Sequence, residues 1–231
     1  GYTAFARMKR SELVINNVQP GDVIVGFASY GQSTYEDSYN SGIGSNGLTS
    51  ARHDLLSKYH ATTYPDSFDS NTPDEVVYIG SKKMTDTIDV DGQDISVGKL
   101  ILSPTRTYLP LISEMLKNHH KDINGMIHCT GGGQTKVLKF VENVHIIKDN
   151  LLEIPPIFKL IQKEAQTDGR EMYQVFNMGH RLEVYTNEAT AQEMIKMGEK
   201  WGIKAQIIGR VEAFENGNKL TIKSPIGTYV Y

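Results

Sequence analysis

The sequence predicts an α/β fold in which a mixed β-sheet is flanked by helices. The continuous apolar run Val23–Ser29 is typical of a strand buried on both faces. Leu48–His60 instead repeats its apolar residues at helical spacing. From about residue 123 onward, strand-like and helix-like segments alternate along the chain. The 231 residues, 39% of them hydrophobic, can fill the core of such a structure.

Turn and cap residues divide the chain into further predicted elements. Tyr2–Ile15 alternates loosely and predicts a strand that needs a neighbour. Asp91-Gly92 predicts a hairpin over residues 85–97. Ser103-Pro104 is an N-cap followed by proline and predicts a helix to about His119. Later helices are expected at Pro155–Glu164, at Arg170–Val175 and from Asn187 to Gly202, and later strands at Val144–Lys148, Leu182–Tyr185, Ala205–Val211 and Lys219–Lys223.

The composition argues against nucleic-acid and membrane partners and bears on the cellular location. The formal charge of −3 gives no electrostatic reason to expect nucleic acid or an anionic membrane surface. No apolar run approaches the roughly 20 residues of a membrane span. The single cysteine cannot form an internal disulfide, which fits a cytoplasmic location. Because the chain begins at Gly1 and runs directly into strand-like sequence, we expect a fragment that lacks its N-terminal part.

The most informative stretch is Gly125–Lys136, in which three glycines follow a strand and precede a helix. Glycines allow the backbone to approach a ligand closely and to adopt positive φ. The N–H groups of the following helix would point at a ligand over the turn. This arrangement is that of a phosphate or anion cradle, although a tight turn without a ligand fits the spacing equally well. It is not a Walker A loop, because Gly-Lys-Ser/Thr is missing.

A second glycine pattern, Gly42, Gly44 and Gly47, spells G-x-G-x-x-G. A dinucleotide fingerprint follows its strand directly, whereas a dozen polar residues intervene here, so a nicotinamide site is disfavoured. Ser45 and Asn46 can still cap the next helix, giving a second helix N-terminus able to hold an anion.

Covalent and metal chemistry find little support in the residue pattern. His128 and Cys129 are adjacent in a strand and so face opposite sides of the sheet. We expect Cys129 in the core, whereas His128 leads into the glycine turn and could be functional. His119-His120 diverge on a helix, and no histidine grouping has zinc-like spacing.

What remains is a set of polar, glycine-lined turns at strand ends, suited to phosphates or a polar small molecule. The candidate binding residues, beside His128, are Ser45, Asn46, Gly47, Arg106, Thr130, Gly131, Gly132, Gly133, Asn177 and Gly179.

Five ordered motifs resemble the aminoimidazole ribonucleotide synthetase family, the phosphoribosylformylglycinamidine cyclo-ligases of de novo purine synthesis. They are Gly21–Val25, Ser45–Gly47, Ser103–Arg106, His128–Gly133 and Phe176–Gly179, and Ile207–Glu212 is similar to the family's closing strand. The resemblance spans nearly the whole chain. It implies that residues 16–231 form the C-terminal α/β domain and that residues 1–15 are the last strand of a missing ferredoxin-like N-terminal domain.

The resemblance also implies a function. Family members use ATP and Mg²⁺, bound mainly by the N-terminal domain, to phosphorylate the amide oxygen of formylglycinamidine ribonucleotide. An internal nitrogen then closes the imidazole ring, a reaction that needs positioning and charge stabilisation. His128 and the glycine turns would line the cleft that takes substrate or nucleotide phosphates. The full-length protein would be a homodimer, and this fragment alone would be inactive.

Two departures and two alternatives accompany the resemblance. Gly44 stands where the family usually has histidine, and His180-Arg181 stands where a small apolar continuation is usual. One alternative is another ATP-dependent phosphoryl-transfer member of the superfamily, such as selenophosphate synthetase or thiamine-phosphate kinase. The other is a binding domain without catalysis of its own.

Overall fold

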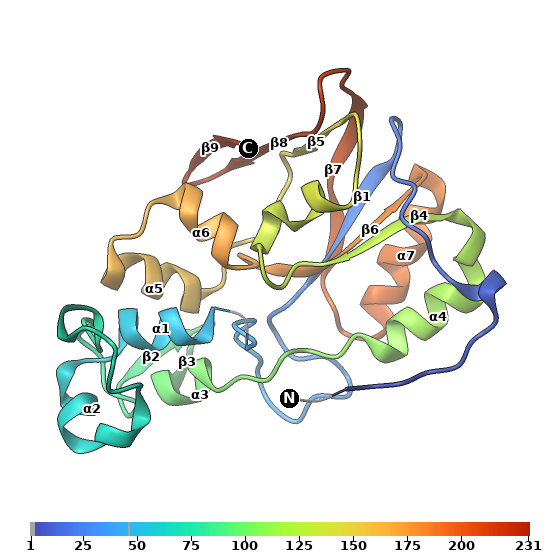
Figure 1. Ribbon diagram of the computed structural model, residues 1–231. Coiled ribbons are helices and arrows are strands. Elements are labelled where there is room, and N and C mark those ends of the chain that lie inside the picture. The colour runs from blue at the N-terminus through green and yellow to red at the C-terminus, as the bar shows by residue number, and fades with distance from the viewer. Residues whose placement is uncertain (1–2, 46) are drawn as a thin grey trace.

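The computed structural model describes residues 3–45 and 47–231. Its centre is a seven-stranded sheet in the order β4-β6-β1-β7-β5-β8-β9 (Figure 1). Neighbouring strands are antiparallel except for β5 and β8, which are parallel. The predicted mixed sheet flanked by helices is confirmed. Its strands are β1 (Val23–Ala28), β4 (Ile123–His128), β5 (Val144–Lys148), β6 (His180–Thr186), β7 (Ala205–Ala213), β8 (Lys219–Ser224) and β9 (Gly227–Val230).

Helices cover both faces of this sheet, and the predicted hairpin around Asp91-Gly92 forms a separate two-stranded sheet (Figure 1). The hairpin consists of β2 (Thr87–Val90) and β3 (Gln93–Ser96). The helices are α1 (Leu48–Leu55), α2 (Lys58–Thr63), α3 (Val97–Ile101), α4 (Leu109–His119), α5 (Pro156–Ala165), α6 (Gly169–Val175) and α7 (Glu188–Lys200). Short 3₁₀ turns occur at Arg10–Glu12, Pro65–Ser67, Asp74–Val76, His120–Asp122 and Gly133–Lys139.

One hydrophobic core lies on each face of the sheet. Strand β1 is therefore buried on both faces, as its apolar run predicts. Ile24 packs into the larger core, to which α1, α3, α5 and α6 contribute. Val25 and Phe27 belong to the smaller core under α4 and α7. The alternation of Ile24 and Val25 between the cores is the period-2 geometry of a strand. The position of β1 between β6 and β7 brings the ends of strands from distant parts of the chain together.

Local sequence signals explain most helix boundaries. Asn187 caps α7, its side chain accepting a hydrogen bond from the Thr190 backbone N–H at 3.0 Å. Gly202, with φ of +67°, follows the end of α7 in the left-handed conformation that favours glycine. Pro156 occupies the first turn of α5, where its missing N–H costs no helical hydrogen bond.

The helix predicted from Ser103-Pro104 begins later than expected, at Leu109. Residues 103–107 are not helical, because Arg106 and the following Tyr108 are held by the end of β1. The Arg106 guanidinium donates to the backbone oxygens of Ala28 and Tyr30 at 2.9 and 2.8 Å. The Tyr108 hydroxyl donates to the Ala28 oxygen at 3.0 Å. These tertiary contacts override the local N-cap signal.

One other sequence expectation is wrong. The single helix over Leu48–His60 is split at Leu56-Ser57, because Ser57 N–H pairs with the Lys82 oxygen at 2.9 Å and interrupts the helical ladder. The strand expected at Tyr2–Ile15 needs a neighbour and stays a prediction; within residues 3–15 the structure has one 3₁₀ turn and no strand. The chain first contacts the sheet edge at Asn16 and Asn17, which bond to the backbone of β4.

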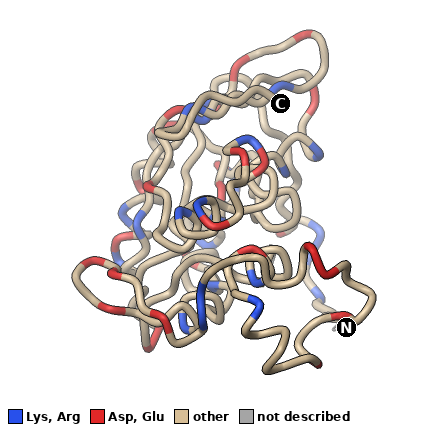
Figure 2. The backbone as a smooth tube through the Cα atoms, turned by 90° about the vertical axis from the view of Figure 1, so that its left-hand side faces the viewer, with Lys and Arg blue, Asp and Glu red and all other residues tan. Residues whose placement is uncertain are grey.

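In the part of the chain that the structure describes, no helix has the length and apolar character required to cross a membrane. Figure 2 shows basic and acidic residues interspersed along the tube rather than gathered by sign on one side.

Candidate functional site

The glycine turn after β4 has the backbone conformation that only glycine adopts without strain. Gly132 and Gly133 have φ of +94° and +48°. The Gly133 N–H bonds the Thr130 oxygen at 2.7 Å, which closes the turn tightly. A seven-residue 3₁₀ helix, Gly133–Lys139, follows it where an ordinary helix was expected. So short a helix has little dipole, and an anion here must be held mainly by neighbouring cations and turn N–H groups.

Lys136 is a candidate that the sequence analysis missed. Its ammonium returns over the turn and donates to the Thr130 hydroxyl at 2.7 Å. Lys136 forms no ion pair within residues 3–45 and 47–231. A lysine one turn beyond a glycine cluster is the signal that could have identified it.

His128 and Cys129 face opposite sides of the sheet, as predicted. Cys129 is buried in the larger core, and His128 is exposed at the end of β4. Desolvation, together with the charges of Arg181 and Lys136, lowers the pKa of His128. The imidazole is therefore neutral at pH 7, with one ring nitrogen free to accept a proton or hydrogen bond.

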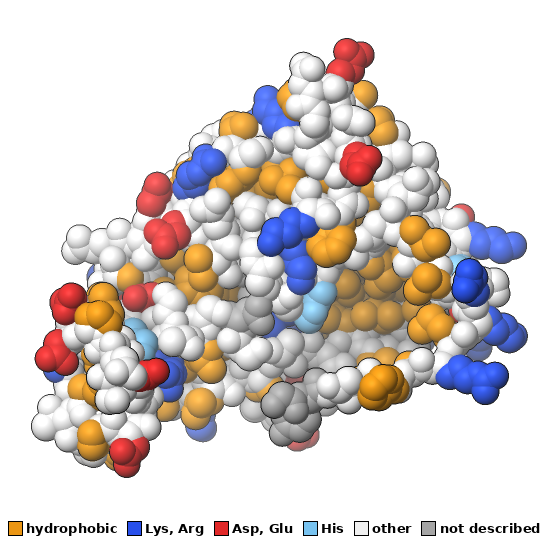
Figure 3. All heavy atoms as spheres, in the orientation of Figure 1, with side chains coloured by type: hydrophobic (Ala, Val, Ile, Leu, Met, Phe, Trp, Pro, Cys, Tyr) orange, Lys and Arg blue, Asp and Glu red, His pale blue; other side chains and the backbone are white. Residues whose placement is uncertain are grey.

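A groove of about 510 Å³ opens beside His128. The turn before α4 contributes Thr105 and Arg106 to its lining, whereas Met126 and Leu182 make it apolar. Figure 3 shows this hollow between α4 and the edge of the sheet, with hydrophobic side chains inside it and a histidine and cationic side chains at its border. Of the predicted site residues that the structure describes, His128 and Arg106 line this groove and the glycine turns do not, so the predicted cleft stays a prediction.

A second cation, Arg181, lies under the turn that precedes α1. Its guanidinium donates to the oxygens of Gly42 and Ile43, both at 2.8 Å. Arg181 is buried, its Nε has no hydrogen-bond partner among the described residues, and no carboxylate pairs with it there. Burial lowers the pKa of Arg181, because an unpaired buried charge is costly. An anion bound nearby would offset that cost.

Asn177 ties its own turn to the end of β1 and to the glycine turn at Gly42. Its side-chain oxygen accepts from the Ser29 hydroxyl at 2.7 Å, and its amide donates to the Gly42 oxygen at 2.8 Å. The Asn177 side-chain oxygen also accepts a hydrogen bond from the Gly179 N–H at 3.1 Å. Gly179 has φ of +121°, and a Cβ there would press on the Glu153 backbone oxygen. Asn177 and Gly179 therefore hold the turns in place, and their direct contact with a ligand stays a prediction.

A fully buried ionic network supports the glycine turn from below. The Lys148 ammonium pairs with Glu183 and also donates to the Gln134 backbone and side-chain oxygens at 2.8 and 3.0 Å. Gln134 in turn donates to the His180 oxygen at 3.0 Å. The Tyr185 hydroxyl donates to Glu183 at 2.7 Å. This network fixes the first residue after the three glycines, and no sequence signal identified it.

The remaining predicted residues are placed as follows. The Arg106 guanidinium is engaged with Glu36, at 2.6 Å, and with backbone oxygens around residue 30. Its phosphate-binding role stays a prediction, whereas its structural role is plain. Ser45 is exposed, and its N–H reaches the Thr105 hydroxyl at 3.3 Å. Gly47, with φ of +77°, is the N-cap of α1 in place of the expected serine or asparagine. Asn46 lies outside the described residues.

The arrangement suits an anion rather than covalent or metal chemistry. Lys136, Arg181 and the turn N–H groups are positioned to hold phosphate oxygens, and neutral His128 stands at the edge. Across residues 3–45 and 47–231, no three His, Cys, Asp or Glu side chains come close enough to hold a metal ion. Fold and site together are those of an α/β domain with a candidate anion site.

Comparison with known proteins gives the family. Residues 19–219 match the family described as "AIR synthase related protein, C-terminal domain". The chain belongs to this family. The phosphoribosylformylglycinamidine cyclo-ligase of Methanocaldococcus jannaschii is 33% identical over 227 residues, covering 97% of this chain and 55% of the relative. The phosphoribosylformylglycinamidine cyclo-ligase of Carboxydothermus hydrogenoformans is 34% identical over 204 residues, covering 87% of this chain and 48% of the relative.

Solved structures are similar to this chain at low sequence identity. Thermotoga maritima PurL complexed with FGAR is 15% identical with a TM-score of 0.45, over 95% of this chain and 28% of that one. The hydrogenase maturation protein HypE of E. coli is 13% identical with a TM-score of 0.45, over 94% of this chain and 50% of that one. The chain spans about half the length of the two cyclo-ligases that it matches.

Proposed function

We propose that this chain is the C-terminal domain of an ATP-dependent cyclo-ligase that converts formylglycinamidine ribonucleotide to aminoimidazole ribonucleotide. The five ordered motifs and the names of the relatives support this specific activity within the family. The observation that carries it is the pair of uncompensated cations, Lys136 and Arg181, at two adjoining glycine turns.

The chain's own residues have separable tasks in this proposal. Lys136 and the N–H groups of Gly131 and Gly132 hold a phosphate of the ribonucleotide or nucleotide. Arg181 contributes a fixed positive charge that costs no reorganisation during the reaction. Neutral His128 accepts a hydrogen bond or proton at the reacting end. ATP, when bound, supplies the phosphoryl group that activates the amide oxygen.

The parts outside this chain are also proposals. Since the described residues form no acidic metal cluster, we assign the Mg²⁺ ligands to an N-terminal domain that precedes residue 16. We propose the same origin for the dimer interface of the full-length cytoplasmic enzyme. The extended segment at residues 3–15 then pairs as a strand only in that domain. This chain alone is expected to show no turnover.

The decisive experiment is a calorimetric titration of this chain with formylglycinamidine ribonucleotide, and separately with ATP and Mg²⁺. We expect saturable binding of the ribonucleotide that is lost in Gly132→Val, because a β-branched residue is strained at positive φ. Gly217→Val is the matched control, since Gly217 has φ of +95° and lies between β7 and β8, outside the glycine turn. Binding of ATP alone would favour another phosphoryl-transfer role, and unchanged ribonucleotide binding by Gly132→Val would exclude this site.

A further inference from the structure

A second cavity lies away from the glycine turns, among α2, the segment after it and the end of α3. Its volume is about 550 Å³, which is within the range of small-molecule sites. Tyr59, Tyr64 and Tyr78 form its aromatic lining, and Ile101 and Leu102 also line it. None of the residues that line the groove beside His128 lines this cavity.

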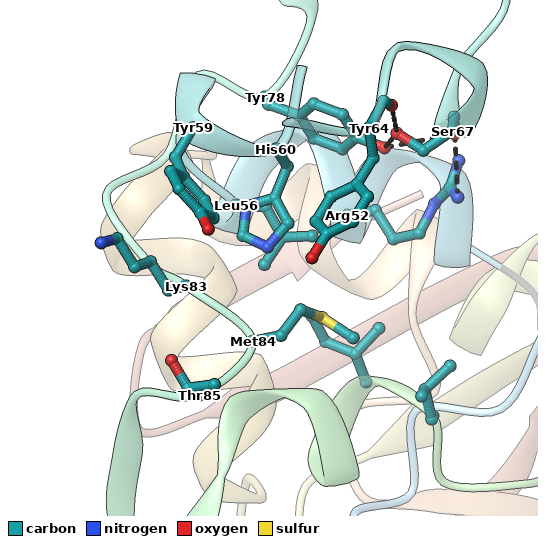
Figure 4. Close-up of a pocket in the computed structure, with 12 residues that line it drawn as sticks. Arg52, Leu56, Tyr59, His60, Tyr64, Ser67, Tyr78, Lys83, Met84 and Thr85 are labelled. Atoms are coloured by element: carbon teal, nitrogen blue, oxygen red, sulfur yellow. Dashed lines mark hydrogen bonds between the residues drawn. The ribbon is translucent and has the colours of Figure 1, made fainter. Parts of the chain in front are cut away.

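The aromatic side of the cavity is built around His60. The His60 ring stacks edge-on against Tyr59 at 5.5 Å and lies 6.2 Å from Tyr64 and 6.0 Å from Tyr78. Figure 4 shows the rings of Tyr59, His60 and Tyr64 projecting side by side into the cavity, with Met84 facing them. Tyr59 and Tyr64 are 47% and 55% exposed, although large rings gain most from burial. The cavity thus presents unburied aromatic surface.

His60 supplies a polar group that the protein itself leaves unused. It is only 6% exposed, and its Nδ1 finds no hydrogen-bond partner among the described residues. A buried polar atom without a partner costs free energy. A ligand with a hydrogen-bonding ring would recover that loss.

The charged side chains that line the cavity are both cationic. They are Arg52 and Lys83, and among the described residues no carboxylate lines the cavity, although the whole chain carries a formal charge of −3. Lys83 lies 4.6 Å from the centre of the Tyr59 ring, and Arg52 makes only one long bond, 3.4 Å to the Ser67 oxygen. Neither cation forms an ion pair within the described residues. Such cations attract an anionic group.

We propose that this cavity binds a planar aromatic anion of up to mononucleotide size. The ring of the ligand lies against Tyr59 and Tyr64 and hydrogen-bonds His60. Its anionic group binds Lys83 at the rim or Arg52 deeper in the wall. This site is separate from the glycine turns and independent of the reaction proposed for them.

The test is a calorimetric titration of the chain with adenosine 5′-monophosphate, compared with adenosine and with ribose 5-phosphate. We expect saturable binding of the monophosphate and about tenfold weaker binding of adenosine, because a charge-assisted hydrogen bond is lost. Ribose 5-phosphate should bind weakest, as it has no ring to stack. Equal affinities for monophosphate and adenosine would remove the anionic half of the proposal. Equal affinities for monophosphate and ribose 5-phosphate would remove the aromatic half.

Variants locate the binding. Lys83→Met and Tyr64→Leu change exposed side chains, so the fold should persist, and each should weaken monophosphate binding by about tenfold. Lys58→Met is the matched control, since it removes the same charge from α2 outside the cavity. Gly132→Val should leave this binding unchanged. Absence of saturable monophosphate binding would refute the proposal, as would binding that responds to Gly132→Val but not to Lys83→Met.

Discussion

The replacement Lys148→Met tests the buried network under the glycine turn. Lys148 and Glu183 are both fully buried, so the carboxylate depends on protein groups for its solvation. Burial by itself would raise the pKa of Glu183, but Lys148 and the hydrogen bond from His180 bring it down to about 2. Methionine keeps most of the side-chain volume and removes the charge and its donors. Glu183 is then a buried anion without a cation.

We expect a loss of about 3–5 kcal/mol in the free energy of unfolding at pH 7, the usual cost of breaking a buried pair. That is a large share of the roughly 5–15 kcal/mol of a typical domain. The loss must depend on pH. In the wild type, the pKa of Glu183 is lower in the folded protein than in the unfolded chain. The resulting stability is fully present above about pH 4.5 and is lost as the pH falls towards 2.

In the variant, burial without Lys148 raises the pKa of Glu183 above its unfolded value. The protonated carboxyl is then tolerated at low pH, and stability is lost as pH rises through the new pKa. The difference between variant and wild type should therefore shrink as pH falls from 7 towards 4.5.

Urea unfolding at several pH values from 4.5 to 7 measures this difference. Lys200→Met is the control, because Lys200 pairs with Glu114 at the surface, where solvent screens the pair, and its loss should cost little stability. The double variant Lys148→Met/Glu183→Gln removes both charges and should recover part of the loss. A pH-independent loss, or one no larger than that of Lys200→Met, would refute the account of the network.

Three further predictions concern the site itself. Lys136→Met removes one of the charges that depress the pKa of His128, so NMR titration should show that pKa rising towards 6.5; an unchanged value would place Lys136 away from the imidazole. Since protonation of His128 is disfavoured in the folded state, the stability lost as pH falls below 6.5 should be smaller in the same variant, as measured by urea unfolding. Gly44→Ala should destabilise by at least about 1 kcal/mol, because φ is +60° and the new Cβ would overlap the Arg181 guanidinium; wild-type stability would contradict this packing.

The sequence was a good guide to elements whose signals are local. The run Val23–Ser29, the hairpin turn Asp91-Gly92 and the cap Asn187 all lead to the predicted elements. It failed where distant residues decide. The start of α4 depends on Arg106 reaching the end of β1, and the break before α2 depends on pairing with Lys82. Such contacts leave no periodic trace in the sequence around them.

The same division applies to the site. Glycine clusters are visible in the sequence, and glycine adopts positive φ far more readily than other residues, so the turn at Gly132 and Gly133 was predictable. The contacts of the cations were not. Lys136 reaches Thr130 across the glycine turn, and Lys148 of β5 meets Glu183 of β6, although β1 and β7 separate these two strands in the sheet. A charge is identified as part of a site by what surrounds it, and those surroundings are tertiary.

The two departures from the family pattern are one structural feature. By the family resemblance, Gly44 stands where histidine is usual, and His180-Arg181 stands where a small apolar continuation is usual. In the structure the Arg181 guanidinium occupies the space into which a side chain at position 44 would project. It bonds the oxygens of Gly42 and Ile43 in the same turn. A nitrogen-bearing side chain is thus retained beside this turn but is supplied by β6, and Gly44 is required because any Cβ would displace it. We infer that neither departure counts against an anion site, since together they provide a permanent charge where histidine would provide one that titrates.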